Sequence, residues 1–193
     1  VKKLLFARQL EMEKGRLSLL GQRMVITPAE TFIYLLKTAR DKEKIGKQIY
    51  YGCKLAGLRG FTKEIMIKYG LTGDKLTKWQ ADIAMLGGWG EFEFRDVDYI
   101  NKKSVIHVRN SPIAILYGKS KISVDHAIRG FIAGAAEALF KESMNTVEVA
   151  CQAKNDKHCE FVTKKTEEFN FKDNVVREQL GNSIEEIKNY ESD

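Results

Sequence analysis

One face of a predicted β-strand is formed at the start of the chain by Leu4, Phe6, Arg8, Leu10 and Met12, which follow the two-residue period of a strand. The sequence Glu13-Lys14-Gly15 follows as a turn, and a returning strand over about residues 16–26 would lie beside the first. The pattern therefore predicts that the chain opens with a β-hairpin.

After residue 26 the sequence predicts a series of α-helices. Thr27-Pro28-Ala29-Glu30 combines a helix N-cap, a proline at the first helical position and a capping-box glutamate, so we expect a helix over about residues 28–39. Apolar residues recur three or four apart over residues 45–69, which predicts one long helix, bent or broken near Gly60. A third helix is expected over residues 74–86.

Two more hairpins are predicted in the second half of the chain. The first would pair the alternating residues 91–95 and 104–109, and the second would pair residues 144–153 with residues 158–164. Each pair encloses a short polar segment, so both hairpins are expected to be antiparallel.

A helix over about residues 123–141 is predicted between these hairpins, after an apolar stretch at residues 113–117. The residues expected on its inward face are Ala127, Phe131, Ala135 and Leu139. Gly130 and Gly134 lie one turn apart on it, which indicates that a neighbouring backbone packs closely there.

The order of these elements predicts the fold class. The chain lacks the alternation of parallel strands and crossover helices that a doubly wound sheet needs, so we expect a mixed α/β fold of the α+β type. Its mainly antiparallel twisted sheet would be built from hairpins and packed against several helices in a single domain over residues 1–165. Residues 166–193 form an acidic tail, expected to be helical and to lie on the surface.

The net charge of +6 is unevenly distributed, because residues 166–193 hold eight acids and three bases and the rest of the chain carries +11. The lysines are scattered, and no helix-turn-helix, zinc-finger or RNA-binding aromatic motif is present, so a nucleic-acid partner is not expected. The sequence shows no signal peptide and no uncharged apolar run of about 18 residues, so we expect a cytoplasmic protein without a membrane partner.

Motifs for catalysis are missing. The sequence contains no glycine-rich dinucleotide turn after a strand, no phosphate loop and no nucleophile elbow. His107 falls in a predicted strand and His126 at a helix start, where a lone histidine is usually a packing or surface residue. The residues therefore give no catalytic set that would make the protein an enzyme.

Cys151 and Cys159 flank the turn of the last hairpin, where pairing would place their side chains about 5 Å apart. Two facing thiolates suit zinc above all, and the alternatives are a cross-strand disulfide or two buried free thiols. Glu148 lies three residues before Cys151, so on a regular strand the two would point to opposite faces. Joint ligation needs a bulge or bend between them. Cys53 is instead expected to be buried in helix packing.

The sequence around these residues resembles the vinyl-4-reductase domain family. Glu148-x-x-Cys151, the seven-residue spacer, Cys159 and Glu160-Phe161-Val162 resemble its C-terminal signature, and Gly130-Phe131-Ile132-Ala133-Gly134 resembles the preceding helix. The resemblance covers about residues 90–165. It implies a fold related to subunits of the TRAPP trafficking complex and to heme-based nitric-oxide sensors. It also implies a binding module for hydrocarbons or aromatics, of the free-standing archaeal type.

The resemblance further implies a structural zinc site. In the phenol-responsive regulators that this region resembles, the glutamate and both cysteines bind zinc together with a cysteine of the preceding helix, whose position here is Asp125. The implied ligands are Glu148, Cys151, Cys159 and Asp125. His126 or His158 is the alternative fourth ligand.

An apolar pocket for a small hydrophobic or aromatic ligand is implied as well. The aromatic residues expected to line it are Trp79, Trp89, Phe92, Phe94, Tyr117 and Phe131. Two other functions stay open, a protein-interaction scaffold like the trafficking subunits and a reductase of a vinyl-bearing tetrapyrrole. We also expect a homodimer, since a free-standing domain must assemble through its own surface and two-fold pairing is the commonest arrangement.

Overall fold

The computed structural model describes residues 10–191, so the alternating residues 4–9 lie outside the described part. Strands β1 (Leu10–Glu13), β2 (Arg16–Leu19) and β3 (Gln22–Met24) form an antiparallel sheet in sequence order. The β1–β2 hairpin is therefore confirmed over the described residues, but the single returning strand is wrong. Leu20 and Gly21 both have positive φ (55° and 85°), and they turn the chain a second time.

Helix α2 (Glu30–Thr38) begins two residues later than predicted. Its N-cap position is Ala29, which has no capping side chain. The predicted cap, Thr27, forms a hydroxyl–hydroxyl hydrogen bond with Thr31 (2.9 Å) rather than with a backbone N–H group of the first turn. The capping prediction is therefore wrong, although the helix itself is confirmed.

The long helix and the third helix are both confirmed. Helix α3 (Lys42–Ala56), the π-helical turn η1 (Gly57–Thr62) and helix α4 (Lys63–Tyr69) follow one another without a break, and η1 includes the predicted irregularity near Gly60. Gly70 ends α4 with a left-handed backbone conformation, and α5 (Gly73–Leu86) follows it.

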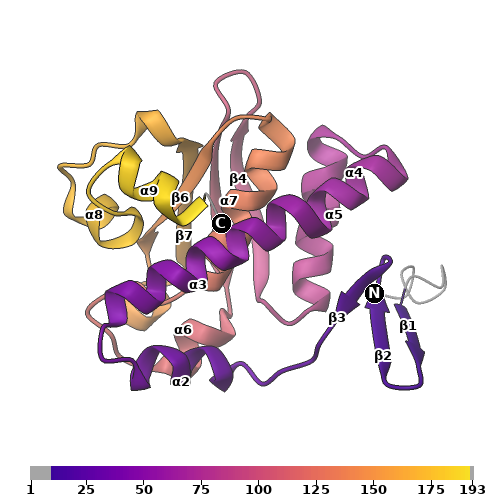
Figure 1. The fold of residues 1–193 in the computed structure, drawn as a ribbon, viewed down its shortest axis with the longest axis horizontal. Coiled ribbons are helices and arrows are strands. Elements are labelled where there is room, and N and C mark those ends of the chain that lie inside the picture. Colours follow the sequence, from indigo (N-terminus) through magenta and orange to yellow (C-terminus); the bar gives the residue numbers. More distant parts are fainter. Residues whose placement is uncertain (1–9, 192–193) are drawn as a thin grey trace.

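The main sheet is antiparallel and has the strand order β4-β5-β7-β6. The two predicted hairpins supply its strands, which are β4 (Glu91–Asp98), β5 (Lys103–Arg109), β6 (Met144–Ala150) and β7 (Cys159–Lys165). Short α6 (Pro112–Tyr117) and long α7 (His126–Phe140) connect the hairpins. Figure 1 shows α3 crossing α7, with α2 and α6 side by side below them. The expected fold class is confirmed.

Helices α3 and α7 pack with their backbones in contact. A Cβ atom at Gly130 would collide with the carbonyl oxygen of Tyr50, and one at Gly134 would collide with the carbonyl oxygen of Lys54. The two glycines therefore allow the backbones to touch, as their spacing predicts. Within residues 10–191, no helix is long and apolar enough to span a bilayer.

The acidic tail is part of the packed structure. It forms the short turn η3 (Thr166–Glu168), then α8 (Asn174–Leu180) and α9 (Ile184–Glu191), so one surface helix is the wrong description. Gly181, with φ of 116°, separates the two helices. Leu180 and Ile187 are buried, and the hydroxyl of Tyr51 donates a hydrogen bond to the Leu180 carbonyl (3.0 Å).

The tail and α3 also cover strand β6, which lies at the edge of the sheet. The backbone of Glu148 is held by the Gln179 amide, which accepts from its N–H (2.8 Å) and donates to its C=O (2.8 Å). The N–H of Thr146 donates to the Tyr50 hydroxyl (3.1 Å), and Arg129 donates to the Thr146 carbonyl (3.3 Å). Buried side chains thus take the place of a neighbouring strand.

The α3–α7 contact generates a test with a matched control. Gly134→Ala should lower the free energy of unfolding by roughly 1–3 kcal/mol, because the added methyl group has no room. Gly52→Ala, on the exposed side of α3, meets no described atom within 4 Å and should raise it by roughly 0.5–1 kcal/mol through better helix propensity. Urea denaturation measures both, and equal shifts in the two variants would disprove the close contact.

Candidate functional site

A β-bulge shapes the end of the last hairpin. Glu148 pairs with Phe161, whereas Ala150 pairs with Glu160, so Val149 is an extra residue in β6. The extra residue changes the alternation of faces after Glu148. Glu148 and Cys151 consequently lie on the same buried side, which the regular strand would not allow.

Cys151 and Cys159 are both buried, and both are free thiols. The turn between them starts with the 3₁₀ turn η2 (Gln152–Lys154). The backbone N–H of Gln152 donates to Sγ of Cys159 (3.3 Å), and Asp156 accepts from the N–H of Cys151 (2.8 Å). These bonds hold the two sulfurs on the inner side of the hairpin.

Asp125 joins them from the residue before α7. Its Oδ1 accepts a hydrogen bond from the Ser111 hydroxyl (2.7 Å), and its backbone N–H donates to Oε2 of Glu148 (3.2 Å). One carboxylate oxygen of each acid is thereby fixed. Ligand atoms of Asp125, Glu148, Cys151 and Cys159 all lie within 4.8 Å of one another.

The remaining oxygen of each acid has no hydrogen-bond partner among the described residues. Both Oδ2 of Asp125 and Oε1 of Glu148 are buried and unpaired there, which is costly inside a protein. Burial raises the pKa of Asp125 to about 7, and burial together with the Asp125 charge raises the pKa of Glu148 well above its usual value. A hydrogen bond from Cys159 lowers the pKa of Cys151 to about 6. The site is thus a buried cluster of acidic groups.

Neither alternative fourth ligand joins this group. The His126 ring lies in the core, with Nδ1 at 3.4 Å from Nη2 of Arg129, and burial next to this cation lowers its pKa to about 3. His158 lies instead beside His107 and Glu160. Of the three candidates considered from the sequence, the fold brings only Asp125 to Glu148 and the cysteines.

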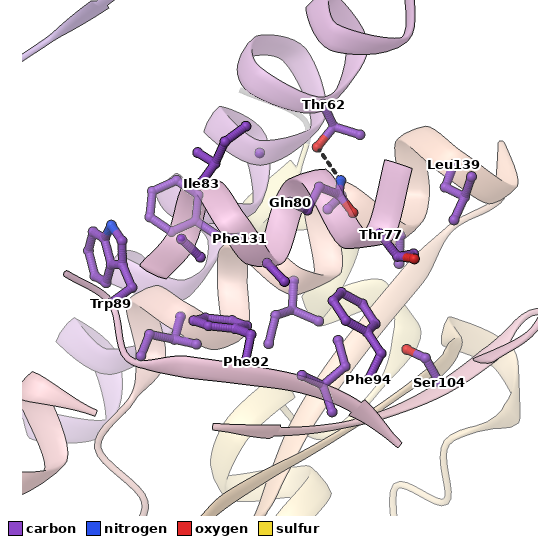
Figure 2. A pocket seen from close by; sticks show the side chains of 18 of the residues that line it. Thr62, Thr77, Gln80, Ile83, Trp89, Phe92, Phe94, Ser104, Phe131 and Leu139 are labelled. Atoms are coloured by element: carbon purple, nitrogen blue, oxygen red, sulfur yellow. Dashed lines mark hydrogen bonds between the residues drawn. The ribbon is translucent and has the colours of Figure 1, made fainter. Parts of the chain in front are cut away.

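A cavity of about 250 Å³ lies between α5, α7 and the β4–β5 hairpin. Phe92 and Phe94 project from β4 toward the helix that carries Thr77 and Gln80, as Figure 2 shows. Leu19 of the N-terminal sheet also contributes to the wall. The cavity is therefore formed by segments from both halves of the chain.

The aromatic residues expected at a pocket divide into two groups. Those that line the cavity are Trp89, Phe92, Phe94 and Phe131. Trp79 packs instead against Tyr69, with ring centroids 5.6 Å apart, and Tyr117 lies under the ammonium group of Lys37 at 4.8 Å. The last two residues are thus outside this wall.

The predicted inward face of α7 needs a correction. Ala127 is buried, but Phe131 is 36% exposed, and the residues fully covered by protein lie on the neighbouring face of the helix. Ala135 and Leu139 line the cavity together with Phe131. This face is therefore the cavity wall, and the closest packing of α7 takes place at its glycines.

The sequence did not predict the polar residues that line the cavity. The spacing of apolar residues along a helix shows which face is apolar, but it does not show which polar side chains point into a cavity. The polar lining residues are Thr62, Thr77, Gln80 and Ser104. Gln80 donates to the Thr62 hydroxyl (3.1 Å), and Thr77 donates to the Asp74 carbonyl (3.1 Å). Ser104 is buried on β5.

Comparison with known proteins supports the resemblance found in the sequence. Residues 104–165 match the model of the vinyl-4-reductase domain, and no curated protein matches the chain. The fold is similar to the phenol-responsive sensory domain of the transcription activator PoxR, solved with phenol, at a TM-score of 0.75 and 18% identity over 92% of this chain and 94% of that one. The resemblance to the vinyl-4-reductase domain family is thereby confirmed.

Two further solved structures are similar at comparable identity. The first is subunit 3 of a trafficking protein particle complex from Naegleria fowleri, covalently bound to palmitic acid, with a TM-score of 0.53 and 19% identity over 70% of this chain and 91% of that one. The second is a vinyl-4-reductase family protein from Methanocaldococcus jannaschii, with a TM-score of 0.41 and 20% identity over 76% of this chain and 99% of that one.

Proposed function

We propose that this chain, whose residues 104–165 match the vinyl-4-reductase domain, is a binding module for a small hydrophobic or aromatic molecule. The observation that carries the proposal is the cavity of about 250 Å³, lined mostly by apolar side chains. An engineered apolar cavity of about 150 Å³ is enough to bind benzene. The similarity in fold to the PoxR domain that was solved with phenol supports the same class of ligand.

The polar wall residues suggest how an aromatic ligand would be oriented. The Thr62 and Gln80 side chains bond to each other, and Thr77 bonds to the backbone. Ser104 lies on the opposite wall, on the sheet side. We therefore expect the Ser104 hydroxyl to meet a polar group of the ligand, while the aromatic side chains contact its apolar part.

Phenol and toluene form a matched pair of ligands for testing this proposal. Because Trp89 lines the cavity and Trp79 does not, phenol should change the tryptophan fluorescence of the protein and of Trp79→Phe, but not that of Trp89→Phe. Ser104→Ala should lower the affinity for phenol several-fold, through loss of a hydrogen bond worth about 1 kcal/mol, and leave toluene affinity unchanged.

Two negative results together would contradict the proposal. In thermal-shift assays, phenols, fatty acids and tetrapyrroles would give no rise in melting temperature, and the fluorescence of the protein would not respond to phenol. Equal loss of phenol and toluene binding in Ser104→Ala would show that the serine supports the wall and does not contact the hydroxyl group.

We further propose that Asp125, Glu148, Cys151 and Cys159 hold a structural zinc ion. Support comes from the two unpaired buried oxygens, and from the position of the four residues, whose ligand atoms lie within 4.8 Å of one another. Two thiolates and two carboxylates match the ligands and the coordination number of a closed zinc site. Free thiols here suit a reducing compartment such as the cytoplasm. The ion would supply positive charge to a group of acids and would connect α7 to the last hairpin.

Serine substitutions test the zinc site. Cys151→Ser or Cys159→Ser should abolish stoichiometric zinc and lower the melting temperature, because ligands that meet only in the folded state convert binding energy into stability. Cys53→Ser should keep the metal, since Cys53 lies on α3 outside the group. Elemental analysis of untagged, reduced protein is the measurement.

A second variant separates the effect of the acid's charge on stability from the effect of zinc binding. Glu148→Gln removes one of the clustered acids, so in a chelator it should be at least as stable as the unmodified protein, whereas in zinc it should be less stable. Protein that contains no zinc and takes none up under reducing conditions would contradict the assignment. A loss of stability in Glu148→Gln that is independent of zinc would do the same.

We also propose a homodimer that pairs through α2 and α6. These neighbouring helices expose apolar side chains, Tyr34 and Leu35 on the first and Ile115 and Leu116 on the second, each at least 46% exposed. An apolar face of this kind is typical of a contact with another chain.

Light scattering checks the dimer against the chain mass of 22.0 kDa. Twice this mass is expected at micromolar concentration, and Leu116→Glu should return the protein to the monomer by placing a charge in the interface. Lys119→Glu, just beyond α6, is a control that should leave the dimer intact. A monomer at all micromolar concentrations would refute the proposal.

A further inference from the structure

A second group of potential ligands lies on the other face of the last hairpin. His107 of β5 is directly opposite Glu160 of β7, and His158 precedes β7 by one residue. Cys159, between His158 and Glu160, points into the core. The alternation of β7 therefore places these side chains outward, where His107 is 17%, His158 27% and Glu160 31% exposed.

The three side chains converge on one carboxylate oxygen. Oε2 of Glu160 lies 2.9 Å from Nε2 of His107 and 3.7 Å from Nε2 of His158. The two imidazoles are stacked, with ring centroids 3.9 Å apart and planes inclined by 27°. Their Nε2 atoms thus lie toward the same carboxylate, and the ligand atoms of all three residues are within 4.8 Å of one another.

These separations can be compared with those around a bound ion. Metal–ligand bonds of about 2.0–2.2 Å in a tetrahedral site place neighbouring ligand atoms about 3.3–3.6 Å apart. The observed values of 2.9 and 3.7 Å lie on either side of this range. The two stacked rings would have to rotate away from each other on binding, so that each Nε2 lone pair points at the ion.

Charges around the group leave Glu160 available. Glu93 is the acid that pairs with His107 in the β4–β5 ladder. Its carboxylate is already bound by Arg95 (2.7 Å) and Arg109 (2.9 Å). Glu160 contacts the two imidazoles instead, so one carboxylate and two nitrogen ligands meet at this point.

We propose that His107, His158 and Glu160 form a second metal site, for a divalent transition-metal cation such as zinc, nickel or cobalt. Two imidazoles and one carboxylate suit these borderline cations, and Ca²⁺ or Mg²⁺ would require more oxygen ligands. Three protein ligands leave at least one coordination position to water or to an external ligand. Since the side chains reach solvent, the ion exchanges faster than one held by the buried cysteines.

The site is tested by titrating Co²⁺ into untagged protein that carries one equivalent of zinc, the amount that the cysteine group alone would bind. The tag is left out because a polyhistidine sequence would itself bind the metal. Isothermal calorimetry should show about one further equivalent bound. His107→Gln/His158→Gln should take up none, although glutamine can still donate a hydrogen bond to Glu160 and the fold is kept. Glu142→Gln, which removes a surface carboxylate bound to Lys102 and Lys165, should behave like the unmodified protein.

Optical spectra distinguish this site from the cysteine group. Co²⁺ bound by thiolates gives intense charge-transfer absorption, whereas Co²⁺ bound by imidazole and carboxylate does not. Cys151→Ser should therefore still bind one Co²⁺ without that absorption, even if the proposed zinc site is wrong. No Co²⁺ uptake by metal-free Cys151→Ser, or equal uptake by the double histidine variant, would overturn the inference.

Discussion

The contact between the backbones of α3 and α7 is the constraint on which the rest of the structure depends. Because Gly130 and Gly134 carry no side chain, α7 lies directly against the carbonyl groups of Tyr50 and Lys54. A helix held this closely is rigid, and it presents three features at once: Asp125 at its start, Arg129 toward β6, and Phe131 in the cavity wall. A displacement of α7 would disturb all three together.

The buried acids next to α7 create an electrostatic conflict that the chain does not resolve by itself. Ionised, Asp125 and Glu148 would repel each other and the thiolates in a medium of low dielectric constant. Protonated, they would each need an acceptor for the new O–H group. The zinc ion that we propose for this group would satisfy both oxygens and reduce the repulsion.

Several features could be predicted from the sequence because they depend on local chemistry. The spacing of Gly130 and Gly134 indicated a close contact, and the hairpin turn indicated that Cys151 faces Cys159. The bulge at Val149 has no sequence signal, since no glycine marks it, and Leu20 turns the chain in a conformation that leucine rarely adopts. The burial of the tail depends on contacts such as Tyr51–Leu180, between residues 129 positions apart, which periodicity cannot reveal.

The side chains that bond to the backbone of edge strand β6 also protect the protein from aggregation. An edge strand with unpaired N–H and C=O groups is a template on which a strand of another molecule can add. Here the Gln179 amide occupies both backbone groups of Glu148, and the Tyr50 hydroxyl occupies the N–H of Thr146. Residues 104–165, which match the vinyl-4-reductase domain, contain this strand but not its cover. The acidic tail and α3 therefore shield this edge of the sheet from addition of a foreign strand.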